Sequence, residues 1–303
     1  MLRVTFLGTS AAQPTAARNL SALAMRHAGE LFLFDCGEGT QRQMIRYSTG
    51  FDVSAVFFTH FHADHYIGAI GFLRTLSMLE REEPLHLYGP RPAQRLLEVM
   101  LFTGTDPLAF PVEIHEIGPG EVIPVAGAQV RAYPTAHRMP SLGYALVEDE
   151  RPGRFHPERA EALGVPPGPL FGELQHGRRI EVGGRLVRPE QVMDEPRRGR
   201  AVVVTGDTRP SPETVAAARG ADLLIHEATF GDAERGRAAE TFHSTAREAA
   251  RVAREAAVGQ LLLTHLSTRY DRDPSPLVQQ AREEYPAVDV AHDGLELEIP
   301  LPE

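Results

Sequence analysis

Short runs of hydrophobic residues recur along the chain, and most of them end in a turn or in a polar residue. Runs of about four to eight apolar or β-branched residues, bounded by glycine or polar residues, are typical of β-strands. On this pattern we predict strands at residues 2–8, 21–25, 31–34, 55–58, 85–88, 128–133, 201–205, 221–225 and 260–264.

Helical periodicity fills several of the intervals between these strands. Hydrophobic residues three or four positions apart predict a helix at 67–83, and further helices are expected at 93–103, 212–219 and 244–257. The last of these is rich in alanine and arginine, and Ser244 or Thr245 is a suitable N-cap for it. Strands alternating with helices predict an α/β fold.

Four potential metal ligands follow the strand at 55–58 within six residues: His60, His62, Asp64 and His65. In an extended chain residues i and i+2 lie on one side, so His60 and His62 can bind one ion together. Asp64 and His65 then turn toward a second position. Imidazole and carboxylate without thiolate favour zinc, or a similar metal, in an open site where a bound water serves hydrolysis. The alternative, a histidine-rich surface turn, explains four ligands at one strand end less well.

Later strands end in the same way. His137 follows the strand at 128–133, Asp207 follows 201–205, His226 and Glu227 follow 221–225, and His265 follows 260–264. The carboxyl ends of strands converge on one edge of an α/β sheet. A single such residue is more often a buried or loop histidine than a ligand, but the recurrence predicts one shared site.

Composition limits the remaining possibilities. The 303 residues are 42% hydrophobic, and no apolar run approaches the roughly 18 residues that a membrane span requires. We therefore expect a cytoplasmic protein that does not bind membranes. All 31 basic residues are arginine and the net charge is −10, which argues against non-specific nucleic-acid binding. The single cysteine, Cys36, cannot form an internal disulfide, and we interpret it as a buried residue and not as a nucleophile.

Residues 151–200 depart from the pattern. They contain seven prolines and eight glycines, and ten arginines against seven acidic residues. This composition predicts an insertion with irregular backbone, an extended arm outside the layered core. The alternative is a flexible, solvated loop. Several apolar residues indicate instead that the segment is folded: Leu163, Val165, Leu170, Phe171, Leu174, Ile180, Val182 and Leu186.

These motifs resemble those of the ribonuclease Z family, a tRNA 3′-processing branch of the metallo-β-lactamase superfamily, in its short bacterial form. The resemblance runs from residue 2 to about residue 294. It rests on residues 6–10 (FLGTS), 14–19 (PTAARN), 35–41 (DCGEGTQ), 205–210 (TGDTRP), 226–230 (HEATF) and 243–245 (HST), and on 164–174 (GVPPGPLFGEL), which is similar to the family's arm motif.

The resemblance implies an αββα four-layer sandwich with an inserted flexible exosite arm. Residues 1–150 and 197–303 would form the two parts of the core, and residues 151–196 the arm. It also implies two Zn²⁺ per subunit. The implied ligands are His60, His62 and His137 for the first ion, Asp64, His65 and His265 for the second, and Asp207 as the bridge.

The same resemblance implies catalytic roles. Asp64 would also accept a proton, and His243, oriented by Glu227, would protonate the leaving oxygen. Without the resemblance, His243 would be read as a residue that caps the helix after it. The reaction would remove 3′ trailers from precursor tRNA, leaving a 3′-hydroxyl on the tRNA and a 5′-phosphate on the trailer.

Substrate contacts are expected in two places. The loop at 14–19 is linked in the family to the nucleotides after the cleavage point, which nominates Arg18 and Asn19, although Ala16 stands where the family usually has lysine. In the arm, Arg178 and Arg179 are candidates for phosphate contacts. The expected partners are precursor tRNA and a second subunit in a homodimer, and not DNA.

Three alternatives compete with this interpretation. A hydrolase of small phosphodiesters or related esters with the same fold would keep the seven ligands but would need no arm. A non-catalytic RNA-binding module would be expected to lose ligands, and all seven are present. A redox di-iron enzyme of this fold would normally bring a flavin domain, for which the chain has no room.

Overall fold

The structure is a computed structural model that describes residues 1–104 and 106–302. The chain divides into two compact units. The core unit comprises Met1–Val147 and Ala201–Pro300, and the inserted unit comprises Glu148–Arg200 together with the C-terminal residues from Leu301.

One seven-stranded sheet of the core unit is built mainly from the N-terminal half of the chain. Its strands, in spatial order, are β16 (Glu296–Glu298), β1 (Leu2–Gly8), β2 (Ala22–His27), β3 (Glu30–Phe34), β4 (Val53–Phe57), β5 (Leu85–Gly89) and β6 (Val112–Glu116). Strands β3 to β6 run parallel to one another. Its helices are α1 (Thr40–Arg46), α2 (Ala63–Tyr66), α3 (Ala69–Met78) and α4 (Ala93–Leu101).

The second seven-stranded sheet comes mainly from the C-terminal half. Its order is β15 (Val288–Val290), β14 (Gln260–Thr264), β13 (Leu223–Glu227), β12 (Ala201–Val204), β9 (Leu142–Glu148), β8 (Ala128–Pro134) and β7 (Val122–Val125). Strands β12 to β15 are parallel. Helices α7 (Pro212–Ala217), α8 (Arg235–Thr241), α9 (Ala246–Ala256) and α10 (Ser275–Arg282) accompany this sheet, with short 3₁₀ turns at Asp232–Glu234 and Thr268–Tyr270.

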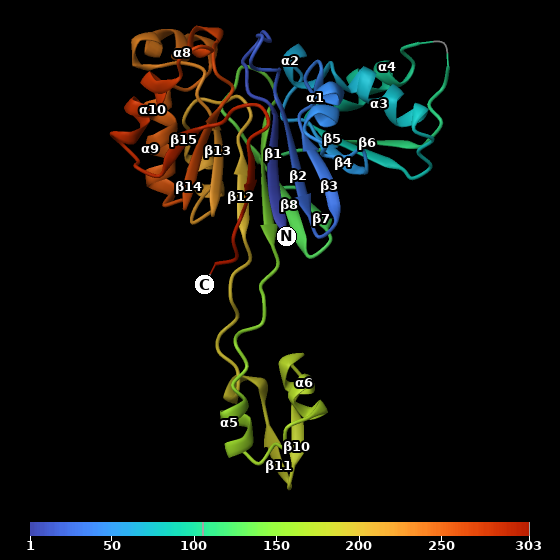
Figure 1. Cartoon of the computed structure of the whole chain (residues 1–303), viewed down its shortest axis with the longest axis vertical. Coiled ribbons are helices and arrows are strands. Elements are labelled where there is room, and N and C mark those ends of the chain that lie inside the picture. The colour runs from blue at the N-terminus through green and yellow to red at the C-terminus, as the bar shows by residue number, and fades with distance from the viewer. Residues whose placement is uncertain (105, 303) are drawn as a thin grey trace. The chain divides into compact units, whose positions relative to one another are not determined.

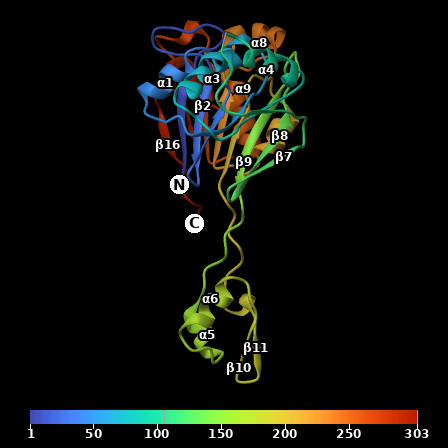
Figure 2. The same cartoon turned by 90° about the vertical axis from the view of Figure 1, so that its right-hand side faces the viewer.

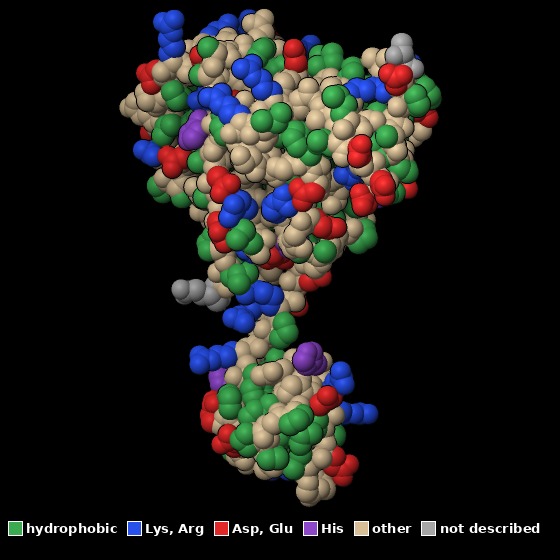
Figure 3. Space-filling model, turned by 45° about the vertical axis from the view of Figure 1, so that its right-hand side comes forward, with side chains coloured by type: hydrophobic (Ala, Val, Ile, Leu, Met, Phe, Trp, Pro, Cys, Tyr) green, Lys and Arg blue, Asp and Glu red, His purple; other side chains and the backbone are tan. Residues whose placement is uncertain are grey.

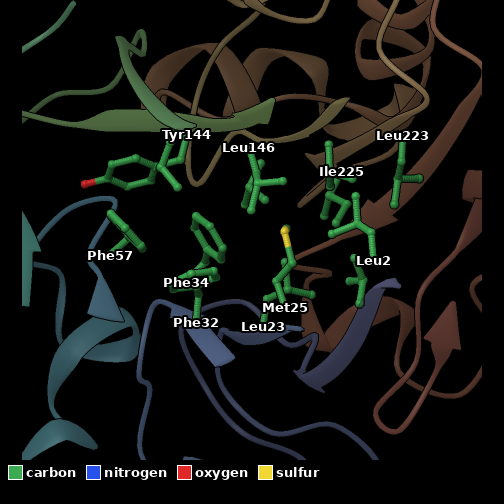
Figure 4. Packing of buried hydrophobic residues seen from close by; sticks show 14 of the residues in the cluster. Leu2, Leu23, Met25, Phe32, Phe34, Phe57, Tyr144, Leu146, Leu223 and Ile225 are labelled. Atoms are coloured by element: carbon green, nitrogen blue, oxygen red, sulfur yellow. The ribbon is translucent and has the colours of Figure 1, made fainter. Parts of the chain in front are cut away.

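The two sheets pack face to face, and helices cover their outer faces (Figures 1 and 2). The central cluster joins side chains of both sheets, such as Phe34 and Phe57 from the first and Tyr144 and Ile225 from the second (Figure 4). Two further clusters fill the outer interfaces, one under α1, α3 and α4 and one under α7, α9 and α10. The architecture is the expected αββα sandwich, which the short apolar strands require because each sheet buries both faces.

The observed elements correct some of the expected boundaries. The helix expected at 67–83 ends at Met78, because the chain turns at Glu80, where φ is +56°. Helix α1, which begins directly after the left-handed Gly39, was not among the expected helices. Helix α9 begins as predicted, because the Thr245 Oγ1 accepts a hydrogen bond from the Glu248 backbone N–H.

The inserted unit is more regular than its composition indicates. It contains α5 (Pro157–Ala162), α6 (Pro169–Gln175), the hairpin β10 (Ile180–Val182) and β11 (Arg185–Val187), and a 3₁₀ turn at Pro189–Gln191. Its own small core includes Val165, Leu174 and Val187. The expectation of irregular backbone was therefore wrong, and so was the inclusion of Leu186, whose side chain is exposed while its neighbour Val187 points inward.

Three surface and burial features bear on function. Cys36 is fully buried as expected, and burial raises the pKa of its thiol to about 12. None of the helices among the described residues has the length and hydrophobicity that crossing a membrane requires. On the displayed surface, basic and acidic side chains mix over the core unit, whereas hydrophobic side chains gather on the visible face of the inserted unit (Figure 3).

Candidate metal centre and catalytic cleft

The parallel strands carry the candidate residues to one place in the core unit. His60, His62, Asp64 and His65 follow β4 and enter α2, and His265 follows β14 directly. His137 lies three residues after β8, and Asp207 lies three residues after β12. All seven predicted ligands belong to one of two adjoining groups. Within each group, the ligand atoms all lie within 4.8 Å of one another.

The first group joins His60, His62, His137 and Asp207. The His62 Nδ1 lies 2.9 Å from the His60 Nε2 and 3.3 Å from the His137 Nε2. The Asp207 Oδ2 lies 3.5 Å from the same nitrogen of His60. Ligands on a zinc ion at about 2.0–2.1 Å stand roughly 3.3 Å from one another in a tetrahedron, so these separations suit a zinc-sized ion.

The second group joins Asp64, His65 and His265. The Nε2 atoms of His65 and His265 are 3.3 Å apart, and the Asp64 Oδ2 lies 3.4 Å from the His265 Nε2. The Asp207 Oδ1 approaches those same two nitrogens at 3.4 and 3.3 Å. Asp207 thus presents one carboxylate oxygen to each group.

The electrostatics of Asp207 call for positive charge. Its side chain is buried, and Oδ1 has no hydrogen-bond donor among the described residues. Burial opposes ionisation, yet His265, His65 and His60 lower the pKa of Asp207 well below its ordinary value. A buried carboxylate oxygen facing only ring nitrogens is costly unless a cation accompanies it. The donor set and this orphaned oxygen together fit a metal centre.

Hydrogen bonds behind His65 and His60 fix the direction of their rings. The His65 Nδ1 lies 2.7 Å from the Asp35 Oδ2, so this nitrogen carries the proton and donates it, which leaves the Nε2 lone pair facing Asp207. Thr59 Oγ1 donates to the same Asp35 oxygen at 2.8 Å, and its own oxygen lies 3.1 Å from the His60 Nδ1. Such partners set the tautomer and raise ligand basicity.

His137 and His265 are held in the same way. The His137 Nδ1 donates to the Phe242 carbonyl at 3.0 Å, and the His265 Nδ1 lies 2.9 Å from the Thr229 Oγ1. Thr229 in turn donates to the Glu227 Oε2 at 2.8 Å.

Phe242 and His265 both adopt left-handed backbone conformations, with φ of +63° and +55°. Non-glycine residues in this region cost about 1–3 kcal/mol each, a strain typical of functional sites.

His243 lies beside the metal groups with Glu227 behind it. The His243 Nδ1 donates to the Glu227 Oε1 at 2.8 Å, and the other ring nitrogen, Nε2, is left for a substrate. Burial works to lower the pKa of His243, but the Glu227 carboxylate raises it to about 9. Glu227 is itself fully buried and accepts further bonds from the backbone N–H groups of Thr208 and Thr229. The pair therefore forms a rigid proton donor at the edge of the site.

A cleft of about 710 Å³ opens over these residues. Asp64, Asp207, His243 and His265 line it, and three exposed arginines complete its wall: Arg138, Arg237 and Arg269. These arginines were not predicted from the sequence, because single basic residues in a loop (Arg138), in α8 (Arg237) and in a 3₁₀ turn (Arg269) carry no shared local signal. Basic side chains around such a cleft suit a substrate that carries several phosphates.

The substrate residues nominated from the loop at 14–19 need one correction. Arg18 is only 7% exposed, and its Nη1 donates to the Thr9 Oγ1 and the Ala291 carbonyl, both at 2.7 Å. Its guanidinium is therefore a structural brace and is not available to RNA. Asn19 is half-buried and donates from Nδ2 to the Glu38 carbonyl at 2.8 Å.

Arg178 and Arg179 are in the inserted unit, where both are exposed. Arg178 forms an ion pair with Glu173 at 2.9 Å, with about two thirds of its side chain exposed. Both arginines follow α6 and precede β10. Their contribution to binding stays a prediction.

Comparisons with known proteins extend this picture. The family model of the metallo-β-lactamase superfamily matches residues 17–179 of the sequence. The family model of the β-lactamase superfamily domain matches residues 192–266. The chain is 61% identical over 303 residues to the ribonuclease Z of Myxococcus xanthus, covering 99% of both chains. It is 54% identical over 302 residues to the ribonuclease Z of Haloferax volcanii, covering 99% of this chain and 95% of that one.

Solved structures give the same result at lower identity. The crystal structure of human tRNase Z, short form, superposes with a TM-score of 0.71 at 28% identity, covering 98% of this chain and 99% of that one. The metallo-β-lactamase fold protein YhfI from Bacillus subtilis has a TM-score of 0.68 at 20% identity, over 98% of each chain, which supports the fold alone.

Proposed function

The chain belongs to the ribonuclease Z family of the metallo-β-lactamase superfamily, and we propose that it cuts precursor tRNA with a two-zinc centre and grips its substrate with the inserted unit. The protein is a metal-dependent endoribonuclease that removes 3′ trailers from precursor tRNA. Its products are a tRNA with a 3′-hydroxyl and a trailer with a 5′-phosphate. We propose that this activity takes place in the cytoplasm.

The observation that carries the two-zinc proposal is the position of Asp207 between the two groups of ligands. His60, His62 and His137 would hold one ion, Asp64, His65 and His265 the other, and Asp207 would bridge them. Bound zinc would supply a nucleophile at neutral pH and would neutralise the phosphate under attack. The nitrogen and oxygen ligands, with no cysteine among them, leave coordination positions for a substrate.

Asp64 is the residue that we assign as proton acceptor. Its Oδ2 accepts a hydrogen bond from the Ala12 backbone N–H at 2.9 Å, so the carboxylate is held in place from the loop at 9–19. Asp64 also lines the cleft. An ionised carboxylate in this position can take the proton of the attacking water as the new P–O bond forms.

His243 is the residue that we assign as proton donor. The leaving group is the 3′ oxygen of the tRNA, and expelling it as an alkoxide is unfavourable. A protonated His243, fixed through Nδ1 by Glu227, can deliver the proton from Nε2 as the P–O bond breaks. General acid catalysis of this kind contributes roughly 10²- to 10⁴-fold. Glu227 does not reach the substrate in this assignment, so it is a positioning residue.

Recognition of the tRNA is assigned to two surfaces. Arg138, Arg237 and Arg269 in the cleft would contact phosphates next to the scissile bond. Arg178 and Arg179 of the inserted unit would contact phosphates of the folded tRNA, which a small cleft cannot recognise. A general phosphodiesterase centre thereby gains selectivity for a structured RNA.

We also propose that the protein is a homodimer in which the inserted unit of one subunit grips the tRNA cut by the other. Exposed apolar residues on α3 and at the end of α4, two helices that pack together, support a subunit contact: Met78 is 83% exposed, Val99 66% and Phe102, which follows α4, 82%. A Phe102→Ser variant should dissociate the dimer in light scattering after size exclusion. A monomeric unchanged chain would contradict the homodimer.

The function is tested with a labelled precursor tRNA whose products are mapped at nucleotide resolution. We expect one cut, with a 3′-hydroxyl upstream and a 5′-phosphate downstream. Asp207→Ala should reduce the rate by more than roughly 100-fold, because the loss of even an outer-shell partner costs about 10- to 100-fold. Asp52→Ala, at an exposed surface ion pair, is the matched control and should leave the rate unchanged. A precursor left intact by the zinc-loaded protein would refute the proposal.

The number of zinc ions at this centre is tested separately. Elemental analysis should find two zinc equivalents fewer in a His60→Ala/His265→Ala variant than in the unchanged chain. A difference of one equivalent would refute the two-ion arrangement while leaving the hydrolytic assignment intact.

A further inference from the structure

A separate cluster of potential metal ligands lies on the first sheet, and it shares no residue with the catalytic centre. His86 is on β5, and Glu113 and His115 are on the neighbouring parallel strand β6. In the register of the two strands His86 is paired with Glu113 and Tyr88 with His115. Side chains two positions apart on a strand share a face, so all three ligand-type residues project from the same side of the sheet.

The three potential ligand atoms converge on one point. The His86 Nδ1 lies 3.2 Å from the His115 Nε2 and 3.4 Å from the Glu113 Oε2, and the latter two atoms are 3.8 Å apart. Three ligands at about 2.0–2.1 Å from a tetrahedral metal stand roughly 3.3–3.4 Å from one another. The observed triangle needs only a small inward movement of Glu113, whose side chain is about half exposed and free to make it.

Protons alone satisfy this triangle poorly. A single hydrogen on the His86 Nδ1 can point at only one of its two neighbours, and the contact between the His115 Nε2 and the Glu113 Oε2 then brings two lone pairs together. The Tyr88 ring also stacks on the His115 ring at a centroid distance of 4.5 Å and an angle of 15°, which holds the imidazole in place.

We propose that the His86 Nδ1, the His115 Nε2 and the Glu113 Oε2 form a separate binding site for a divalent transition-metal ion, with zinc as the physiological occupant. Two imidazoles and one carboxylate suit zinc, nickel or cobalt and disfavour magnesium and calcium, which prefer oxygen ligands. The fourth position is open to water, because all three side chains are at least one third exposed. The proposal does not depend on the proposed function of the catalytic centre.

Binding there would fasten an edge of the sheet. Among the described strands, β6 is the last of its sheet and pairs only with β5. A metal ion held by residues of both strands joins them across the ladder, and it stabilises the folded state through its preference for that state. The expected role is therefore structural, and the cleavage reaction should not require it.

The test compares zinc stoichiometry in the full chain and in a His86→Gln/His115→Gln variant after dialysis against micromolar zinc. We expect the variant to hold one zinc equivalent fewer and to process precursor tRNA at the unchanged rate. Replacing two surface histidines elsewhere, His176→Gln/His292→Gln, is the matched control and should not alter the stoichiometry. Equal zinc content in the unchanged chain and the His86/His115 variant would overturn the proposal.

A second measurement, on a different variant, applies if the His86→Gln/His115→Gln variant folds poorly. Glu113→Gln keeps the size of the side chain and both histidines. It should weaken zinc binding at this site by at least the 10- to 100-fold that loss of an outer-shell partner costs, seen as a shifted titration midpoint. Cobalt added to the unchanged chain should give tetrahedral absorption bands that the Glu113→Gln variant loses in part and that magnesium does not produce. An identical titration in both proteins would also overturn the proposal.

Discussion

Asp35 is not a predicted metal ligand, but its hydrogen bond to the His65 ring orients one of the ligands. The variant Asp35→Asn tests this role directly. The side chain is 7% exposed, and its Oδ1 accepts a hydrogen bond from the Thr59 backbone N–H at 2.7 Å. Its Oδ2 accepts from the Thr59 Oγ1 at 2.8 Å and from the His65 Nδ1 at 2.7 Å. The residue has a φ of +59°, a conformation that asparagine tolerates as well as aspartate, so the substitution changes the hydrogen bonds and spares the backbone.

The magnitude follows from these bonds. If the asparagine oxygen keeps the bond to the Thr59 N–H, its amide group takes the place of Oδ2 and points a donor at the His65 Nδ1. The His65 proton must then move to Nε2, the atom that faces Asp207 and the second group of ligands. We expect zinc affinity to fall about 10- to 100-fold, or roughly 1.4–2.7 kcal/mol. Loss of a buried charge-assisted hydrogen bond should also lower the free energy of unfolding by about 1.5–3 kcal/mol.

The assay is a chelator competition for zinc combined with thermal unfolding of the zinc-free protein. Asp52→Asn is the matched control, because Asp52 also accepts two hydrogen bonds, both from Arg26 at 3.0 Å, but its side chain is 61% exposed. An exposed pair is worth less than about 1 kcal/mol and should not influence zinc. Wild-type zinc affinity in Asp35→Asn would show that Asp35 does not orient His65, and the reasoning would fail.

Three further outcomes are expected. His243→Ala should lower kcat on precursor tRNA by about 10²- to 10⁴-fold while zinc content and KM stay near their original values, and a change in KM alone would contradict its role as proton donor. Arg178→Ala/Arg179→Ala should weaken tRNA binding and reduce the slope of log K against log salt concentration by about 1 for each lost phosphate contact; an unchanged slope would exclude these two arginines. Cys36 should not react with a thiol reagent at about pH 8 until denaturant is added, because burial raises its pKa to about 12 and the reactive form is the thiolate; modification of the folded protein would contradict its burial.

The parts of the fold and site that could be predicted from sequence are those that local patterns encode. An apolar run followed by a polar residue marks a strand end, and this rule located Asp207 and His265 before their spatial proximity was known. The same rule applies to Asp35, which directly follows β3, although this residue serves as a hydrogen-bond partner of a ligand and not as a ligand itself. The N-cap of α9 was equally local, since it depends on Thr245 and Glu248 alone.

Other features depend on contacts that no local pattern records. Arg18 was expected to contact RNA, but its side chain is buried and donates a hydrogen bond to the Ala291 carbonyl. No local pattern predicts this contact, because the two residues are far apart in sequence. The triangle of His86, Glu113 and His115 exists only because β5 and β6 pair in one particular register. Strand β11 has three residues, too few to show the alternation that would have separated Leu186 from Val187.

The most direct test of the central claim is cleavage of a precursor tRNA by the full chain beside a variant in which residues 152–196 are replaced by a short Gly-Ser linker. Arg151 and Arg197 exchange backbone hydrogen bonds at 2.8 and 2.9 Å, so a linker can join the chain there. Bis(p-nitrophenyl) phosphate serves as the small substrate for both proteins. We predict that the variant still hydrolyses the small ester and no longer makes the single cut in the precursor. A full chain that ignores the precursor but hydrolyses the small ester would contradict the tRNA assignment and favour a hydrolase of small phosphodiesters.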